Sequence, residues 1–144
     1  MEEKTSLKKA ILTGWNQAIK VIIKICKIVI PVYLFVQLLA YTGILPKIAL
    51  YLTPLMRIFG LPGDAAIVIL LANCINIYAG IGALGALTLT AKQITILAVM
   101  VTTSHSLFIE TSIIHGLNIP RYLQLLLRIG MMIVLGILMN LLWR

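Results

Sequence analysis

Long apolar segments dominate this chain and constrain its fold more than any other feature. Residues 28–45 contain no charged side chain, and residues 122–142 contain one, Arg128. About 18 apolar residues are enough to cross the hydrocarbon core of a bilayer. The chain of 144 residues is 61% hydrophobic and 11% charged, whereas soluble domains are about 45–50% apolar and about 25% charged. So short a chain cannot bury this much apolar surface within itself, so the composition excludes an ordinary soluble domain and predicts an integral membrane protein.

The order of apolar and polar segments predicts an all-α, polytopic fold with about four transmembrane helices. We expect the spans over residues 28–45, 64–87, 92–113 and 122–142. Residues 47–59 are too short to span and contain Pro54, so we expect a short interfacial or re-entrant helix there. Asp64 follows a turn sequence rich in glycine and proline and is placed to cap the start of the second span.

The N-terminal segment, residues 5–27, is predicted to form an amphipathic helix. Its polar residues recur at spacings of three and four, which places them on one face: Lys9, Thr13, Asn16, Lys20, Lys24 and Lys27. Such a helix lies among lipid headgroups, with Trp15 as an interfacial anchor and a kink at Pro31 where the chain turns into the bilayer. We therefore divide the chain into a basic N-terminal helix, residues 1–27, and a membrane-embedded helical domain, residues 28–144.

The formal net charge is +8, and lysines are concentrated before the first apolar run. The positive-inside rule places the N-terminus in the cytoplasm of a protein that crosses the cell inner membrane several times. The expected partner of these lysines is a bilayer with anionic headgroups rather than nucleic acid, since no base-stacking aromatic residues are interleaved among them. With four spans the C-terminus would also be cytoplasmic, unless the glycine-rich end of the second span folds back as a hairpin.

Polar side chains inside the predicted spans are the candidates for a binding site. Glu110 is the only acid predicted within a span, and a carboxylate at the middle of a lipid-exposed helix costs roughly 2.5–3.5 kcal/mol. In a continuous helix, Thr102 and Ser106 share a face with Glu110, and His105 lies on the neighbouring one. On the second span, Asn73, Asn76 and Gly80 share a face in the same way. These seven residues predict a polar cavity that hydrogen-bonds a small polar solute: Asn73, Asn76, Gly80, Thr102, His105, Ser106 and Glu110.

Each of these residues also has a purely structural interpretation. Glu110 can pair with a nearby base, either Arg121, Arg128 or His115, and His105 can donate to a backbone carbonyl. The two asparagines can hold helices together, which contributes on the order of 0.6–2 kcal/mol per bond. Glu110 and His105 are also candidates for carrying a coupled proton.

Catalysis is not expected. Ser104, His105 and Glu110 resemble a catalytic triad in residue type, but neighbouring residues on one helix point in different directions. Metal-binding motifs are missing as well, because the two cysteines, Cys26 and Cys74, do not form a CxxC pair and no HExxH sequence occurs. The sequence predicts no cofactor and no metal.

One segment of the chain resembles a known family. Residues 31–120 resemble the gate, or nucleoside recognition, domain of small membrane proteins such as spore maturation proteins A and B. The resemblance rests on the sequence LMRIFGLPGDAA at residues 55–66, the following span with its asparagines and glycines, and HSLFIET at residues 105–111. It implies a helical domain that handles a solute, related to gate domains of ferrous-iron and concentrative nucleoside transporters. The chain lacks the additional helices of the nucleoside transporters and the GTPase domain of the iron transporters.

We therefore expect a transport or channel protomer for a small polar solute, nucleoside-like in the terms of the resemblance. Four spans make a thin wall for an enclosed pathway, so we expect a homodimer or a hetero-oligomer with a sister gate protein. The alternative is a subunit that does not transport, but assembles with or regulates another membrane protein.

Overall fold

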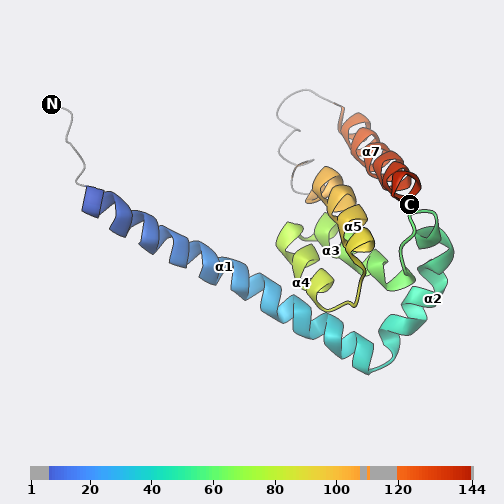
Figure 1. Ribbon diagram of the computed structural model, residues 1–144, viewed down its shortest axis with the longest axis horizontal. Helices are drawn as coiled ribbons and strands as arrows, with labels where there is room; N and C mark the ends of the chain where they lie inside the picture. The colour runs from blue at the N-terminus through green and yellow to red at the C-terminus, as the bar shows by residue number, and fades with distance from the viewer. Residues whose placement is uncertain (1–6, 108–109, 111–119, 144) are drawn as a thin grey trace.

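The computed structural model describes residues 7–107, 110 and 120–143, and all regular structure in that part of the chain is helical (Figure 1). In chain order the elements are α1 (Leu7–Tyr41), α2 (Ile44–Arg57), the 3₁₀ turn η1 (Gly63–Ala65), α3 (Ala66–Cys74), α4 (Ile77–Gly85), α5 (Ala91–Ser104) and α7 (Arg121–Leu142). The all-α prediction is confirmed. The four-span arrangement is not established, because one helix, Tyr122–Leu142, has the length and apolar composition to cross a bilayer within the described residues.

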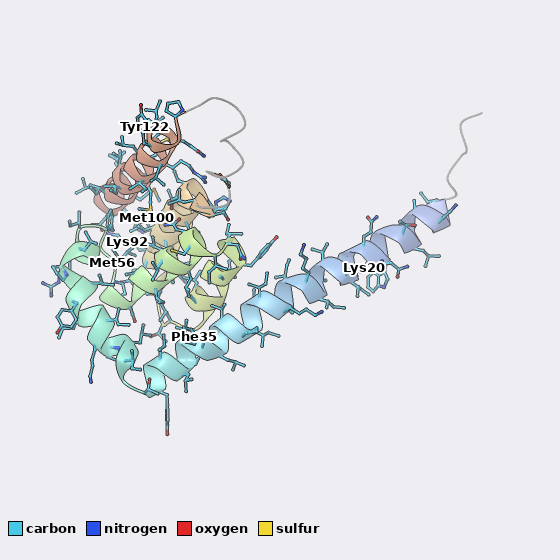
Figure 2. All side chains as sticks on the ribbon, turned by 180° about the vertical axis from the view of Figure 1, so that it is seen from behind. Lys20, Phe35, Met56, Lys92, Met100 and Tyr122 are labelled. Atoms are coloured by element: carbon cyan, nitrogen blue, oxygen red, sulfur yellow. The ribbon has the colours of Figure 1, made fainter. Side chains whose placement is uncertain are left out.

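Helix α1 joins the predicted amphipathic helix and the predicted first span into one element of 35 residues, about 52 Å long. It runs through Pro31 without a break and ends before Gly43, whose φ of 75° lies in the left-handed region. The N-terminal half projects away from the other helices (Figure 1), and the described side chains of residues 7–24 are all exposed. Figure 2 shows them, Lys20 included, with no neighbouring element around them.

Helix α2 is the short helix expected near residues 47–59, with bounds shifted by a few residues. It has 14 residues and includes Pro54, which does not interrupt it. After α2 the chain turns at Gly60, whose φ is 68°. The Asn140 side chain occupies the space where a Cβ at Gly60 would lie, and its amide donates to the Ile58 carbonyl over 3.3 Å. These contacts bring the end of α7 against the turn that follows α2.

The predicted second span is divided into two antiparallel helices of nine residues each, α3 and α4, which form a helical hairpin. Only Ile75 and Asn76 separate them, and Asn76 is extended, with φ −172° and ψ 170°. A Cβ added to Gly80 would lie 2.7 Å from the Ala72 Cβ, so the two helices touch along their length. The sequence left open whether this span is continuous or broken; the structure shows it broken, and the hairpin reverses the chain direction within the predicted span.

Helix α5 lies at the centre of the core. Ile96, Leu97 and Met100 are among its fully buried side chains, and they pack with residues of α2, α3 and α4. Helix α7 closes against α5 at Gly136, where an added Cβ would lie 2.8 Å from both the Met100 Sδ and the Phe59 Cδ1. This close approach holds α7 beside α5 in both views (Figures 1 and 2).

Candidate functional site

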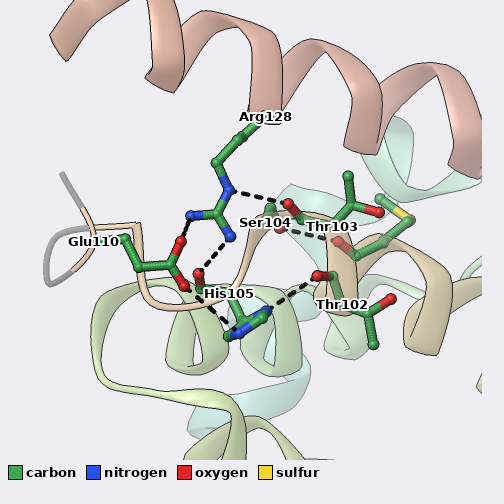
Figure 3. Close-up of polar contacts among 7 residues, drawn as sticks. Thr102, Thr103, Ser104, His105, Glu110 and Arg128 are labelled. Carbon is green, nitrogen blue, oxygen red and sulfur yellow. Dashed lines mark hydrogen bonds and ion pairs between the residues drawn. The ribbon is translucent and has the colours of Figure 1, made fainter. Parts of the chain in front are cut away.

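Arg128 organises the polar contacts at the C-terminal end of α5. Its guanidinium reaches from α7 and donates through Nε to the Thr103 carbonyl over 3.1 Å and through Nη2 to the His105 carbonyl over 3.0 Å (Figure 3). Its third nitrogen, Nη1, pairs with the Glu110 carboxylate. The last carbonyls of a helix lack intrahelical donors and carry partial negative charge, so a cation there satisfies them and stabilises the helix end. Arg128 is thus one of the bases expected to pair with Glu110; His115 and the Arg121 side chain lie outside what the structure describes.

His105 lies beside the same carboxylate. Its Nε2 is 3.7 Å from the Glu110 Oε1, and its Nδ1 is 3.1 Å from the Thr102 carbonyl oxygen (Figure 3). The second contact is the hydrogen bond to a backbone carbonyl that we considered for His105 as a purely structural role. His105 and Glu110 are half-buried, with side-chain exposures of 30% and 38%, so both remain reachable from outside the protein.

Helix α5 ends at Ser104, earlier than expected for a span over residues 92–113. Ser106 then adopts a φ of 55°, rare for a residue other than glycine, and its backbone N–H donates to the Ala72 carbonyl over 2.9 Å. This bond joins the turn at His105 and Ser106 to the end of α3. Thr102, Ser106 and Glu110 consequently do not form one face of a continuous helix, although His105, Ser106 and Glu110 are brought together.

Asn73 lies at the hairpin tip, directly after Ala72. Its Oδ1 is buried and has no hydrogen-bond partner, and an acceptor in that position normally has one. Asn76 is used differently: its Oδ1 accepts from the Ala79 N–H over 3.0 Å and caps the start of α4. Of the two asparagines, Asn73 therefore retains hydrogen-bonding capacity at the tip.

Gly80 and the side chain of Thr102 lie outside this polar cluster. Both line a pocket of about 180 Å³ whose other walls are apolar, between the hairpin and α5. The Thr102 hydroxyl donates to the Ala98 carbonyl over 2.8 Å. Gly80 instead permits the contact between α3 and α4. The structure thus gives these two side chains packing roles. Of the remaining candidates, Asn73 and Asn76 lie at the hairpin tip, and the bond from Ser106 to Ala72 brings the turn at His105 and Ser106 beside it.

The expected capping by Asp64 is not observed. Neither η1 nor α3 receives a side-chain hydrogen bond at its start. A second unpartnered acceptor, the buried Oε1 of Gln124, lies one turn before Arg128 on α7. Sequence reasoning did not single out Gln124, and its spacing of four from Arg128 is the signal that points to it.

Ser104 and His105 do not form the hydrogen-bonded pair that their residue types resemble in the sequence. The Ser104 side chain is fully buried, and its hydroxyl donates to the Met100 carbonyl over 3.0 Å, away from His105. Within the described part of the chain, no three residues among histidine, cysteine, aspartate and glutamate gather closely enough to hold a metal ion. The arrangement is suited to hydrogen bonding of a solute by neutral and charged groups.

Large apolar side chains exposed along α1 and α7 are typical of a helical membrane protein. The family model of the Gate domain, described as nucleoside recognition, matches residues 22–119. The chain therefore belongs to the Gate family, as its resemblance implied, and it is a membrane protein.

A relative in Bacillus subtilis (strain 168), the uncharacterized membrane protein YvoD, is 37% identical over 137 residues. The match covers 95% of this chain and 44% of YvoD, so the chain spans less than half the length of that relative. No solved structure matches the chain.

Proposed function

We propose that this protein is a transport or channel protomer that recognises a small, nucleoside-like polar solute at the tip of its α3–α4 hairpin. The observation that carries the proposal is the buried, unpartnered Oδ1 of Asn73, beside a turn that presents His105 and Glu110. Hydroxyl and amide N–H groups of a nucleoside are the donors that such an acceptor lacks. The role is binding and translocation without catalysis.

The dimensions of the hairpin support this position for the site. Each nine-residue helix is about 13 Å long, roughly half of the hydrocarbon thickness of about 30 Å. A hairpin inserted from one surface would place Asn73 near the midplane, where transporters commonly bind solutes at interrupted helices. Irregular backbone at that depth is tolerated where protein or a water-filled cavity surrounds it.

The proposal includes a multi-pass position in the cell inner membrane with the N-terminus in the cytoplasm. Lys20, Lys24 and Lys27 on the projecting half of α1 would contact anionic headgroups there. With α3–α4 entering and leaving on one side, the chain would cross fewer times than four spans require. The location of the C-terminus, tested by a reporter fused after Arg144, distinguishes these topologies.

A dimer, with itself or with a sister gate protein, is part of the proposal. One chain surrounds the hairpin tip incompletely, because the N-terminal half of α1 contacts no other described element and its side chains are exposed. A second protomer packed there would add the missing wall. Native mass spectrometry from detergent would show a mass twice the 15.9 kDa of one chain.

The same projecting half of α1 supports a second candidate function, a subunit that assembles with a different membrane protein and does not transport. The two functions differ in what the isolated protein does. A transport protomer binds its solute alone, whereas an assembly subunit requires its partner and binds no solute by itself.

The test is ligand-induced thermal stabilisation of the purified protein with nucleosides, nucleobases, amino acids and divalent metals. A ligand at about 100 times its Kd adds roughly 2.7 kcal/mol to the free energy of unfolding. We expect stabilisation by nucleosides that is lost in Asn73→Ala and retained in Asn16→Ala, a matched change on the exposed half of α1. Stabilisation that Asn73→Ala leaves unchanged would contradict the site, and no stabilisation by any class would favour the assembly subunit.

A further inference from the structure

A second, larger cavity lies at the opposite end of the hairpin from its tip. It has a volume of about 610 Å³ and is formed where α1 and α2 meet η1 and the residues that follow α4. Cavities of about 300–1,000 Å³ are the usual size for small organic ligands. Because η1 leads into α3 and residues 86–88 leave α4, this cavity is separated from Asn73 by the length of the hairpin, about 13 Å.

Asp64 gives the cavity its charge. It is the one charged residue among the described residues that line the cavity, and its Oδ1 is buried without a hydrogen-bond partner. The carboxylate is not used to cap η1 or α3, since neither receives a side-chain bond. Because this carboxylate forms part of the cavity wall, the cavity favours a ligand that brings positively charged donors.

The neutral polar groups of the cavity also present acceptors. The Thr53 hydroxyl donates to the Ala49 carbonyl over 2.7 Å, so its oxygen lone pairs remain free to accept a hydrogen bond. The Gln37 amide nitrogen donates to the Ala86 carbonyl over 3.3 Å and to the Tyr33 hydroxyl over 3.4 Å, so its carbonyl oxygen remains as an acceptor. A carboxylate and neutral oxygen acceptors are the kinds of group to which an ammonium donates.

Apart from Thr88, the rest of the lining is apolar, and its largest side chains are Leu45, Leu50 and Leu87. A bare metal ion would leave most of this volume unfilled, and Ca²⁺ or Mg²⁺ needs about six oxygen ligands. An organic cation with an apolar body satisfies both the carboxylate and these walls.

We propose that the cavity between α1, α2 and the base of the α3–α4 hairpin binds a small organic amine in its protonated form, with the ammonium on Asp64 and the apolar body against the leucines. The site is independent of the solute site at the hairpin tip, because the two share no residue.

The test is thermal unfolding of the full chain in detergent with benzylamine, and with benzyl alcohol as a neutral analogue of similar shape. Benzylamine raises the Tm in a saturable manner, and benzyl alcohol does not. Asp64→Asn, which removes the charge and keeps the shape, weakens the apparent affinity for benzylamine by about tenfold or more. Glu110→Gln, a matched loss of a carboxylate at the other site, leaves that affinity unchanged.

A second variant keeps the proposal testable if Asp64→Asn does not fold. Ala40→Leu reduces the volume of the cavity without altering charge, and it weakens benzylamine binding measured by fluorine NMR with 4-fluorobenzylamine. Equal stabilisation by benzyl alcohol, or an unchanged affinity in Asp64→Asn, would overturn the proposal. The proposal would also be overturned if sodium chloride, compared with choline chloride, raised the Tm as much as benzylamine does, because the cavity would then bind a metal cation. It would likewise be overturned if Asp64→Asn changed the oligomeric state and the protein bound no amine. Thermal stabilisation by nucleosides should be retained in Asp64→Asn, so the test of amine binding does not depend on whether a solute binds at the hairpin tip.

Discussion

Replacing Gly80 by alanine tests whether α3 and α4 form a hairpin. The added Cβ would lie 2.7 Å from the Ala72 Cβ and 3.3 Å from the Ala72 Cα. Carbon atoms pack at about 3.5–4.0 Å, so the two helices must separate by about 1 Å. Overpacking of this kind costs about 1–3 kcal/mol, and the better helix propensity of alanine offsets about 0.8–1 kcal/mol of it. We expect Gly80→Ala to lower the free energy of unfolding by up to about 2 kcal/mol.

If the second span were one continuous helix, Gly80→Ala would instead raise the free energy of unfolding. Residues 72 and 80 would then lie about 12 Å apart along one helix axis and could not touch, so alanine would stabilise the protein by its propensity alone. The assay is unfolding by SDS in mixed micelles, followed by circular dichroism. The double variant Ala72→Gly/Gly80→Ala removes the clashing Cβ, and its coupling energy should be about 1 kcal/mol in the favourable direction. Stabilisation by Gly80→Ala, or a coupling energy near zero, would refute the hairpin.

Three further substitutions test the contacts that hold the helices. Arg128→Met removes the donors to the Thr103 and His105 carbonyls and to Glu110. Each bond contributes about 0.5–1.5 kcal/mol, less for the partly exposed carboxylate, so the free energy of unfolding falls by about 2–4 kcal/mol. An unchanged midpoint of SDS unfolding would contradict this role of Arg128. Gly136→Ala lowers the free energy of unfolding by about 1–3 kcal/mol because its Cβ would meet Met100. Gly130→Ala, on the same helix but with open space around it, raises that free energy by about 0.5–1 kcal/mol. Equal effects at the two positions would show that α7 does not pack as described. Thr90→Ala removes the cap of α5 and costs about 0.5–2 kcal/mol, whereas Thr90→Ser retains most of it, and hydrogen exchange of the first turn of α5 distinguishes them.

The apolar pattern predicted the elements that local sequence determines. Helix α7 (Arg121–Leu142) agrees with the expected span 122–142 within one residue, and the turn around Gly60 lies where glycine and proline placed it. The short helix α2 also agrees, although Pro54 lies within it. In these segments the helix period or a turn residue is sufficient to define the structure.

The hairpin could not be predicted from the same pattern. Asn73, Asn76 and Gly80 have helical spacing whether the helix is continuous or broken, so periodicity does not distinguish the two. The break depends on Asn76 capping α4 and on the contact between Gly80 and Ala72. The second is a tertiary contact, formed only once the two halves have folded against each other.

The end of α5 was missed for a related reason. No glycine or proline marks it, and Ser106 enters the left-handed region although its sequence gives no sign of it. The turn is held by Arg128, 25 residues from Thr103, and by the Ala72 carbonyl. The amine cavity likewise draws Gln37, Thr53 and Asp64 from separate elements, and only the fold brings them together.

Protection of Cys74 tests the proposed solute site most directly. This exposed thiol lies beside Asn73 at the hairpin tip, and Cys26→Ser removes the other exposed free cysteine. The rate of alkylation by N-ethylmaleimide would be measured with and without uridine or adenosine. A nucleoside held at the tip at about ten times its Kd slows the reaction about tenfold, and Asn73→Ala abolishes the effect. An unchanged rate at concentrations that saturate the thermal shift would show that the solute binds elsewhere.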